Sequence, residues 1–130
     1  MRIVVGIDWS EESFTTVQQV LHVFRPTQVA LVHGVSMGLL EYPSVAQAAN
    51  FQGYDELRRA LSEAGRQVLD RAASMLPSGC EVTKVNEVAN PGQIILDTAE
   101  AIQADLIAVG ARGRGRLAEI VLGSVSHLRW

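Results

Sequence analysis

The chain has 130 residues and a formal net charge of −3, with 48% hydrophobic and 19% charged residues. This composition excludes a disordered chain and predicts one globular domain over residues 1–130 that needs no disulfide to fold. Cys80 is the only cysteine, and no apolar run reaches the ~18 residues that a membrane helix needs. No signal peptide precedes the first strand-like segment, so we expect a cytoplasmic protein without a membrane partner.

The first half of the chain alternates strand-like and helix-like segments. Met1–Asp8 and Gln28–Val35 are apolar runs of the kind that form strands buried on both faces. Between them, Ser10 is expected to be the N-cap of a helix that ends before Pro26. Ser36–Asn50 has no clear period, and we interpret it as a loop.

The second half continues the same alternation. Tyr54–Leu76 is expected to be a long amphipathic helix, and Glu81–Val88 alternates as a half-exposed edge strand does. A turn at Asn90 leads into a further helix, and Asp105–Val109 is a fourth buried strand. The tail Leu117–Trp130 is helix-like. Strands that alternate with helices predict an α/β fold with a parallel sheet and right-handed crossovers.

The sequence after the fourth strand has the chemistry of an anion site. Three glycines and three arginines are interleaved in Gly110–Arg116, so the backbone can turn its N–H groups inward while the guanidinium groups add positive charge. Further on, Gly123–Ser126 is expected to open a final helix with free N–H groups and two hydroxyls. Two such loops close together suggest a polyphosphate. A mere tight turn at the first loop explains the glycines equally well.

Two well-known phosphate motifs do not fit. The only lysine, Lys84, lies in the edge strand, which excludes a P-loop. The turn Gly6–Ser10 lacks the glycine spacing of the dinucleotide fingerprint. Asp8 nonetheless ends the first strand, where doubly wound sheets place ligand-binding residues. A carboxylate that caps the following helix is the alternative role for Asp8.

Other candidate residues favour structural roles. His33 lies within a buried strand, and we interpret it as a hydrogen-bonded core residue rather than a catalyst. His22, His127 and Cys80 do not have the spacing of metal ligands. The arginines of the tail have no interleaved aromatic residues, and the protein is acidic overall, so nucleic-acid binding is not expected.

The glycine pattern resembles a known signature. Gly110-x2-Gly113-x9-Gly123-Ser124 is similar to the nucleotide-binding motif of the universal stress protein family. Three further segments resemble strands of that family, namely Ile3–Ser10, Leu31–Val35 and Asp105–Gly110. The resemblance covers nearly the whole chain and points to the ATP-binding branch.

The resemblance implies a fold and a site. The fold is a Rossmann-like doubly wound parallel sheet of strand order 3-2-1-4-5, with helices on both faces and a crevice between strands 1 and 4. Adenine and ribose would contact Ile7, Asp8 and Gly34, where Gly34 replaces the usual valine of the family. Ribose and phosphates would lie at Val109, Gly110, Arg112, Gly113, Gly123, Ser124, Val125 and Ser126. ATP is expected to bind together with Mg²⁺, for which no protein ligand is assigned.

One departure from the family concerns the end of the chain. The family continues beyond the Ser-Val-Ser helix into a fifth strand that often forms its dimer interface, whereas this chain stops at Trp130. We therefore expect a truncated domain in which the fifth strand is missing and the fourth is an open edge. A homodimer is still expected from the resemblance, although its usual strand is absent.

These features favour a regulatory module that binds ATP and responds by a change of conformation or partner. One alternative is a slow ATPase or a self-phosphorylating protein with Ser124 or Ser126 as acceptor, for which the sequence offers no general base. A structural module that binds partners without nucleotide is the other alternative.

Overall fold

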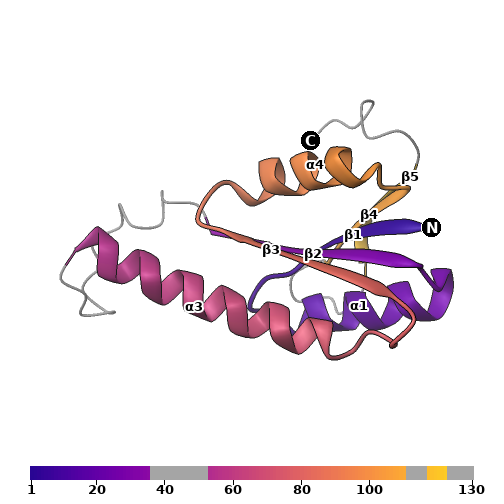
Figure 1. The fold of residues 1–130 in the computed structure, drawn as a ribbon, viewed down its shortest axis with the longest axis horizontal. Coiled ribbons are helices and arrows are strands. Elements are labelled where there is room, and N and C mark those ends of the chain that lie inside the picture. Colours follow the sequence, from indigo (N-terminus) through magenta and orange to yellow (C-terminus); the bar gives the residue numbers. More distant parts are fainter. Residues whose placement is uncertain (36–52, 111–116, 123–130) are drawn as a thin grey trace.

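A computed structural model describes residues 1–35 and 53–110 together with the backbone of 117–122. Its centre is a five-stranded sheet of order β3-β2-β1-β4-β5, in which β1 to β4 are parallel (Figure 1). The strands are β1 (Arg2–Gly6), β2 (Gln28–Gly34), β3 (Glu81–Glu87), β4 (Leu106–Gly110) and β5 (Leu117–Leu122). The helices are α1 (Glu11–Phe24), α3 (Tyr54–Ala73) and α4 (Pro91–Ile102). The predicted α/β fold with helices on both faces is confirmed.

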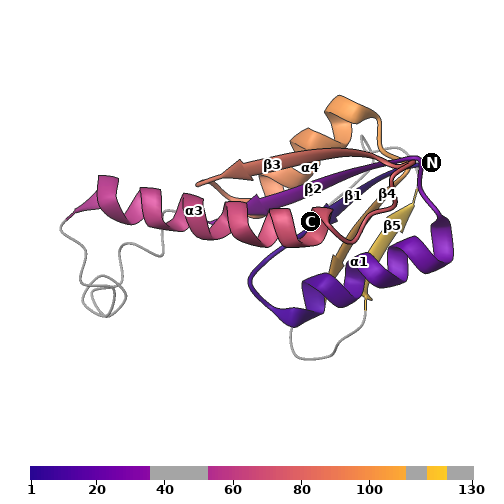
Figure 2. The ribbon, with the colours of Figure 1, turned by 60° about the horizontal axis from the view of Figure 1, so that its bottom comes forward.

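The two faces of the sheet form two separate cores. Successive strand residues point to opposite faces of the sheet. Ile3, Val5 and Leu31 therefore pack on the face that α1 and α3 cover (Figure 2). Val4 and Val32 pack toward α4 on the other face. All five side chains are at most 1% exposed. Burial on both faces is why these strands are near-continuous apolar runs in the sequence.

The expectation that β4 is an open edge of the sheet was wrong. Its neighbour β5 precedes the Ser-Val-Ser sequence, so it is a different strand from the family strand that the resemblance places after that sequence. Leu117–Leu122, which the sequence suggested to be helical, is a strand that pairs antiparallel with β4, and Val121 lies opposite Ile107. The connection 111–116 is long enough for an antiparallel neighbour, whereas a parallel one needs a dozen or more residues. The free backbone groups of β4 thus gain hydrogen-bond partners. This gain outweighs the preference for a helix that the spacing of the apolar residues indicates.

The predicted segment boundaries hold with small shifts. β3 is the edge strand that alternation predicted. Asn90 caps α4, because its Oδ1 accepts a hydrogen bond of 3.1 Å from Gln93 N. α3 ends at Ala73, three residues before the predicted end. The loop prediction for 36–50 and the tail beyond 122 lie outside the described residues.

Backbone hydrogen bonds join the amino-terminal ends of the parallel strands. Thr27 N donates to Met1 O at 3.0 Å, and Glu81 N donates to Thr27 O at 2.9 Å. Asp105 N donates to Arg2 O at 2.8 Å, while Arg2 N donates back to the Asp105 carboxylate at 2.8 Å. The amino-terminal ends of the parallel strands are therefore joined directly to one another. Their carboxyl ends lie at the opposite end of the sheet, where a site can form.

None of the helices in the described part of the chain has both the length and the apolar character that would let it cross a membrane.

Candidate functional site

A cavity of about 420 Å³ opens at the carboxyl ends of β1, β2 and β4. This volume lies within the roughly 300–1,000 Å³ of small-molecule sites. The strand order reverses between β1 and β4, and doubly wound sheets bind ligands at that point. The lining residues come from the strand ends, the turn before α1 and the start of α4: Gly6, Ile7, Asp8, Trp9, Ser13, Val32, His33, Gly34, Val35, Pro91, Ile95, Val109 and Gly110.

The structure brings together every predicted site residue that it describes. Ile7 and Asp8 follow β1, Gly34 ends β2, and Val109 and Gly110 end β4, and all five line the one cavity. The remaining predicted residues lie outside the described part of the chain: Arg112, Gly113, Gly123, Ser124, Val125 and Ser126. The nucleotide contacts of both groups of residues stay a prediction.

Asp8 organises the turn between β1 and α1. Its Oδ1 accepts hydrogen bonds of 2.7 Å from both Ser10 N and Ser13 Oγ, and another from Ser10 Oγ. Asp8 N in turn donates to Ser13 Oγ at 2.8 Å. Ser10 is the N-cap of α1, as predicted, but its hydroxyl binds Asp8 and not a helix N–H. The turn therefore fixes a carboxylate at the cavity, where it is the only acidic group among the described lining residues.

Two glycines allow helix ends to approach the strand ends closely. A Cβ on Gly34 would lie 2.6 Å from Ile94 Cδ1 and 3.0 Å from Pro91 Cα. One on Gly110 would lie 2.8 Å from Thr16 Oγ1. Such distances leave no room for a side chain. The glycine at position 34 thus lets the first turn of α4 form a wall of the cavity.

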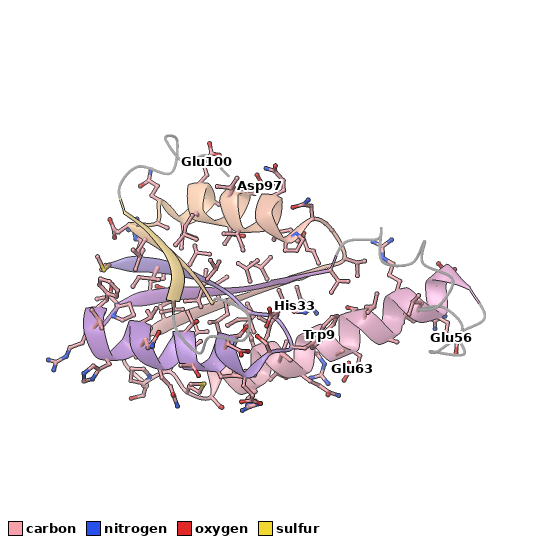
Figure 3. The ribbon with its side chains drawn as sticks, turned by 180° about the vertical axis from the view of Figure 1, so that it is seen from behind. Trp9, His33, Glu56, Glu63, Asp97 and Glu100 are labelled. Atoms are coloured by element: carbon pink, nitrogen blue, oxygen red, sulfur yellow. The ribbon has the colours of Figure 1, made fainter. Side chains whose placement is uncertain are left out.

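His33 and Trp9 line the cavity as well, although the sequence analysis assigned His33 to the core and singled out neither residue for the site. His33 is only 2% exposed, and its Nδ1 lies 3.3 Å from Asn86 Oδ1, which confirms a hydrogen-bonded core residue. It also lines the cavity, together with Trp9, whose ring centroid is 5.2 Å away (Figure 3). Trp9 is 47% exposed. The signal in the sequence was position alone: His33 and Trp9 are immediate neighbours of the predicted contacts Gly34 and Asp8.

The environment of His33 keeps its imidazole neutral at pH 7. Burial lowers the pKa of His33, and this effect exceeds the opposing influence of the Asn86 hydrogen bond and the Asp8 charge. The side chain can therefore act both as a donor and as an acceptor.

This lowered pKa predicts a pH dependence of stability. In the unfolded chain His33 takes up a proton near pH 6.5, but in the folded protein it does so only at lower pH. Protons therefore favour the unfolded state, and we expect the free energy of unfolding to fall as pH drops below about 6.5. Urea unfolding at a series of pH values measures this. A His33→Gln variant should flatten the profile relative to a His22→Gln control, and equal profiles would contradict the assignment.

A contact between helices holds the start of α1 in place. Arg71 on α3 donates to both carboxylate oxygens of Glu11, at 3.0 and 2.9 Å, and lies 3.8 Å above the ring centroid of Phe14. Both partners are more than half exposed, so the ion pair alone stabilises little. Its effect is to orient the first turn of α1, directly after the Asp8 turn.

Comparison with known proteins identifies the family. A family model of the universal stress protein family matches residues 1–127. The chain belongs to the universal stress protein family. The universal stress protein Slr1101 of Synechocystis is 30% identical over 89 residues, which are 66% of this chain and 81% of that protein.

Solved structures share the fold of this universal stress protein. The protein MJ0577 is 25% identical, with a TM-score of 0.67, over 96% of this chain and 84% of that one. A universal stress protein family protein from Arabidopsis thaliana, solved with AMP bound, has a TM-score of 0.57 over 91% of this chain and 81% of that one. Its identity of 13% shows the common fold alone.

Proposed function

We propose that this universal stress protein binds an adenine nucleotide, ATP with Mg²⁺ in particular, at the carboxyl ends of β1, β2 and β4. Binding would regulate its interactions in a stress response. The observation that carries the proposal is convergence: Ile7, Asp8, Gly34, Val109 and Gly110, singled out from the sequence, all line one cavity of about 420 Å³. The Arabidopsis family protein, which shares the fold, was solved with AMP bound, and AMP is of the ligand class proposed here.

The chemistry of the cavity suits a nucleoside. Val35 and Ile95 supply apolar surface for a flat base, and the Asp8 carboxylate can accept a hydrogen bond from a ribose hydroxyl. The phosphates would extend from the end of β4 toward the sequence 111–116 with its three arginines.

The residues present are compatible with Mg²⁺ as a companion of the phosphates. Asp8 is the one acidic side chain lining the described part of the cavity, and the described residues hold no group of three or more potential metal ligands. Mg²⁺ commonly binds through one carboxylate, substrate phosphates and water. The ion would neutralise phosphate charge, while Asp8 and the backbone N–H groups orient the nucleotide.

The first experiment is to denature freshly purified protein and identify released small molecules by mass spectrometry. We expect adenine nucleotide, or, if the site is vacated during purification, a rise in Tm on addition of ATP and Mg²⁺.

A Gly113→Val variant should lose this binding, whereas Gly79→Val, at a glycine with open space around it, should keep it. Ser124→Ala should weaken binding only by about 1 kcal/mol, because we expect phosphate to bind there mainly through backbone N–H groups. A folded Gly113→Val protein that binds ATP as the parent does would contradict this site.

Two further expectations belong to the same proposal. A cytoplasmic location is expected from the sequence composition, and a homodimer is expected from the resemblance to the family. Since β5 occupies the outer edge of β4, a second copy is not needed to cover that edge. Size-exclusion chromatography with and without ATP tests the dimer.

A further inference from the structure

The side chain of Asn86 has one possible orientation. Asn86 Nδ2 lies 2.8 Å from the carbonyl oxygen of Ser62 on α3. A carbonyl oxygen can only accept, so the amide nitrogen must face it, and the amide oxygen Oδ1 must face His33. The Ser62 carbonyl on α3 therefore determines that the amide oxygen of Asn86, and not its nitrogen, faces the imidazole of His33.

This orientation fixes the tautomer of His33. Because Asn86 Oδ1 is an acceptor, the Nδ1 atom 3.3 Å away must carry the proton. Burial keeps the ring neutral, so Nε2 has a lone pair and no proton. Gly65 lies against the Nδ1 edge of the ring, because a Cβ there would be 2.5 Å from Nδ1 and 2.9 Å from Cε1. α3 therefore packs, at Gly65, against the same edge of the imidazole that contacts Asn86.

The place of His33 in the sheet indicates which part of a nucleotide it meets. His33 lies on β2, and β1 separates β2 from β4. The arginine-bearing sequence follows β4, so the proposed function assigns the phosphates to the β4 side of the cavity. The base is then on the β2 side, beside His33, Gly34 and the aromatic ring of Trp9.

We propose that His33 is a specificity-determining residue whose Nε2 accepts a hydrogen bond from the exocyclic amino group of adenine. The site would then select 6-aminopurines over 6-oxopurines, in which an oxygen acceptor replaces the amino donor. This inference rests on the proposed nucleotide function and deepens it. Asn86 is a positioning residue that acts through His33.

The affinity test compares AMP with IMP, which differ at the 6-position of the base. Isothermal titration of the unmodified protein should show AMP binding about tenfold or more tightly than IMP, since the bond is lost and two acceptors face each other with IMP. In His33→Leu the ratio should fall to about threefold or less, because both the bond and the repulsion are removed. Asn86→Leu should reduce the ratio in the same direction, and His22→Gln, an exposed histidine on α1, should leave it unchanged.

A spectroscopic test on the unmodified protein covers the case in which the variants do not fold. With ¹⁵N-labelled histidine, the His33 ring should show a protonated Nδ1 and an unprotonated Nε2. His22→Gln and His127→Gln assign the three imidazoles. On addition of AMP the Nε2 resonance should shift toward that of a hydrogen-bonded acceptor, and IMP should not produce this shift.

The outcomes separate the two proposals. Equal affinity for AMP and IMP, or an Nε2 that is protonated or unmoved by bound AMP, overturns the role of His33 and leaves nucleotide binding intact. Failure of both AMP and IMP to bind overturns the proposed function together with this inference.

Discussion

An Asp8→Ala variant is expected to lose about 100-fold in affinity for adenine nucleotide, because a hydrogen bond to a charged group contributes about 1.5–3 kcal/mol. The carboxylate supplies the acidic acceptor of the cavity and also binds Ser10 N and the hydroxyls of Ser10 and Ser13. Its removal takes away a ligand contact and the bonds that shape the turn. Isothermal titration with AMP and with ATP and Mg²⁺ measures the loss.

Two matched variants separate these contributions. Asp8→Asn keeps an acceptor oxygen for Ser10 and Ser13, so it should fold as the parent does. It should still bind nucleotide more weakly, because a neutral amide oxygen is a weaker acceptor than a carboxylate. Asp97→Ala removes an exposed carboxylate on α4, where it accepts from Gln93 Nε2 at 2.8 Å outside the cavity. Its nucleotide affinity should not change. If Asp8→Ala bound nucleotide like Asp97→Ala, Asp8 would have no part in the site.

A Gly65→Ala substitution is expected to lower the free energy of unfolding by about 1–3 kcal/mol, the usual range for overpacking. The new Cβ would collide with Asn86 Oδ1 and lie 2.5 Å from His33 Nδ1. In an exposed helix, glycine to alanine would instead stabilise by roughly 1 kcal/mol. The sign of the change thus reports the close approach of α3 to the His33–Asn86 pair. Chemical denaturation measures it.

Gly79→Ala is the control, since no atom lies within 4 Å of a Cβ at that turn. It should leave stability within roughly 0.5 kcal/mol of the parent. A Gly65→Ala protein more stable than the parent would show that α3 can move away without cost, and the fixed tautomer of His33 would then lose its basis.

The parallel core and the cavity could be predicted from the sequence because their signals are local. Met1–Asp8 and Asp105–Val109 are continuous apolar runs, and such runs form strands buried on both faces. The first run ends in Asp8 and the second is followed by Gly110, and parallel strands bring their carboxyl ends to the same end of the sheet. The resemblance to the family then supplied Gly34 and the order 3-2-1-4 of the parallel strands, which the structure confirms.

The features that were not predicted depend on contacts between distant segments. Leu117–Leu122 has apolar spacing that suits a helix, and only the free edge of β4 makes it a strand. The role of His33 depends on Asn86, 53 positions later, and on how closely Gly65 approaches both. No local pattern encodes such an approach, because it is set by the packing of α3 on the sheet.

The hydrogen bonds that join Thr27 to Met1 and Glu81, and Asp105 to Arg2, have a consequence for how this protein can change. They lie at one end of strands that, at about 3.3 Å per residue, separate them from the cavity by up to roughly 20 Å. Substitutions this far apart usually add independently in their effect on stability. Side chains that line the cavity, such as Trp9 and Val35, can therefore be exchanged while the hydrogen-bonded amino-terminal ends of the strands continue to hold the sheet together.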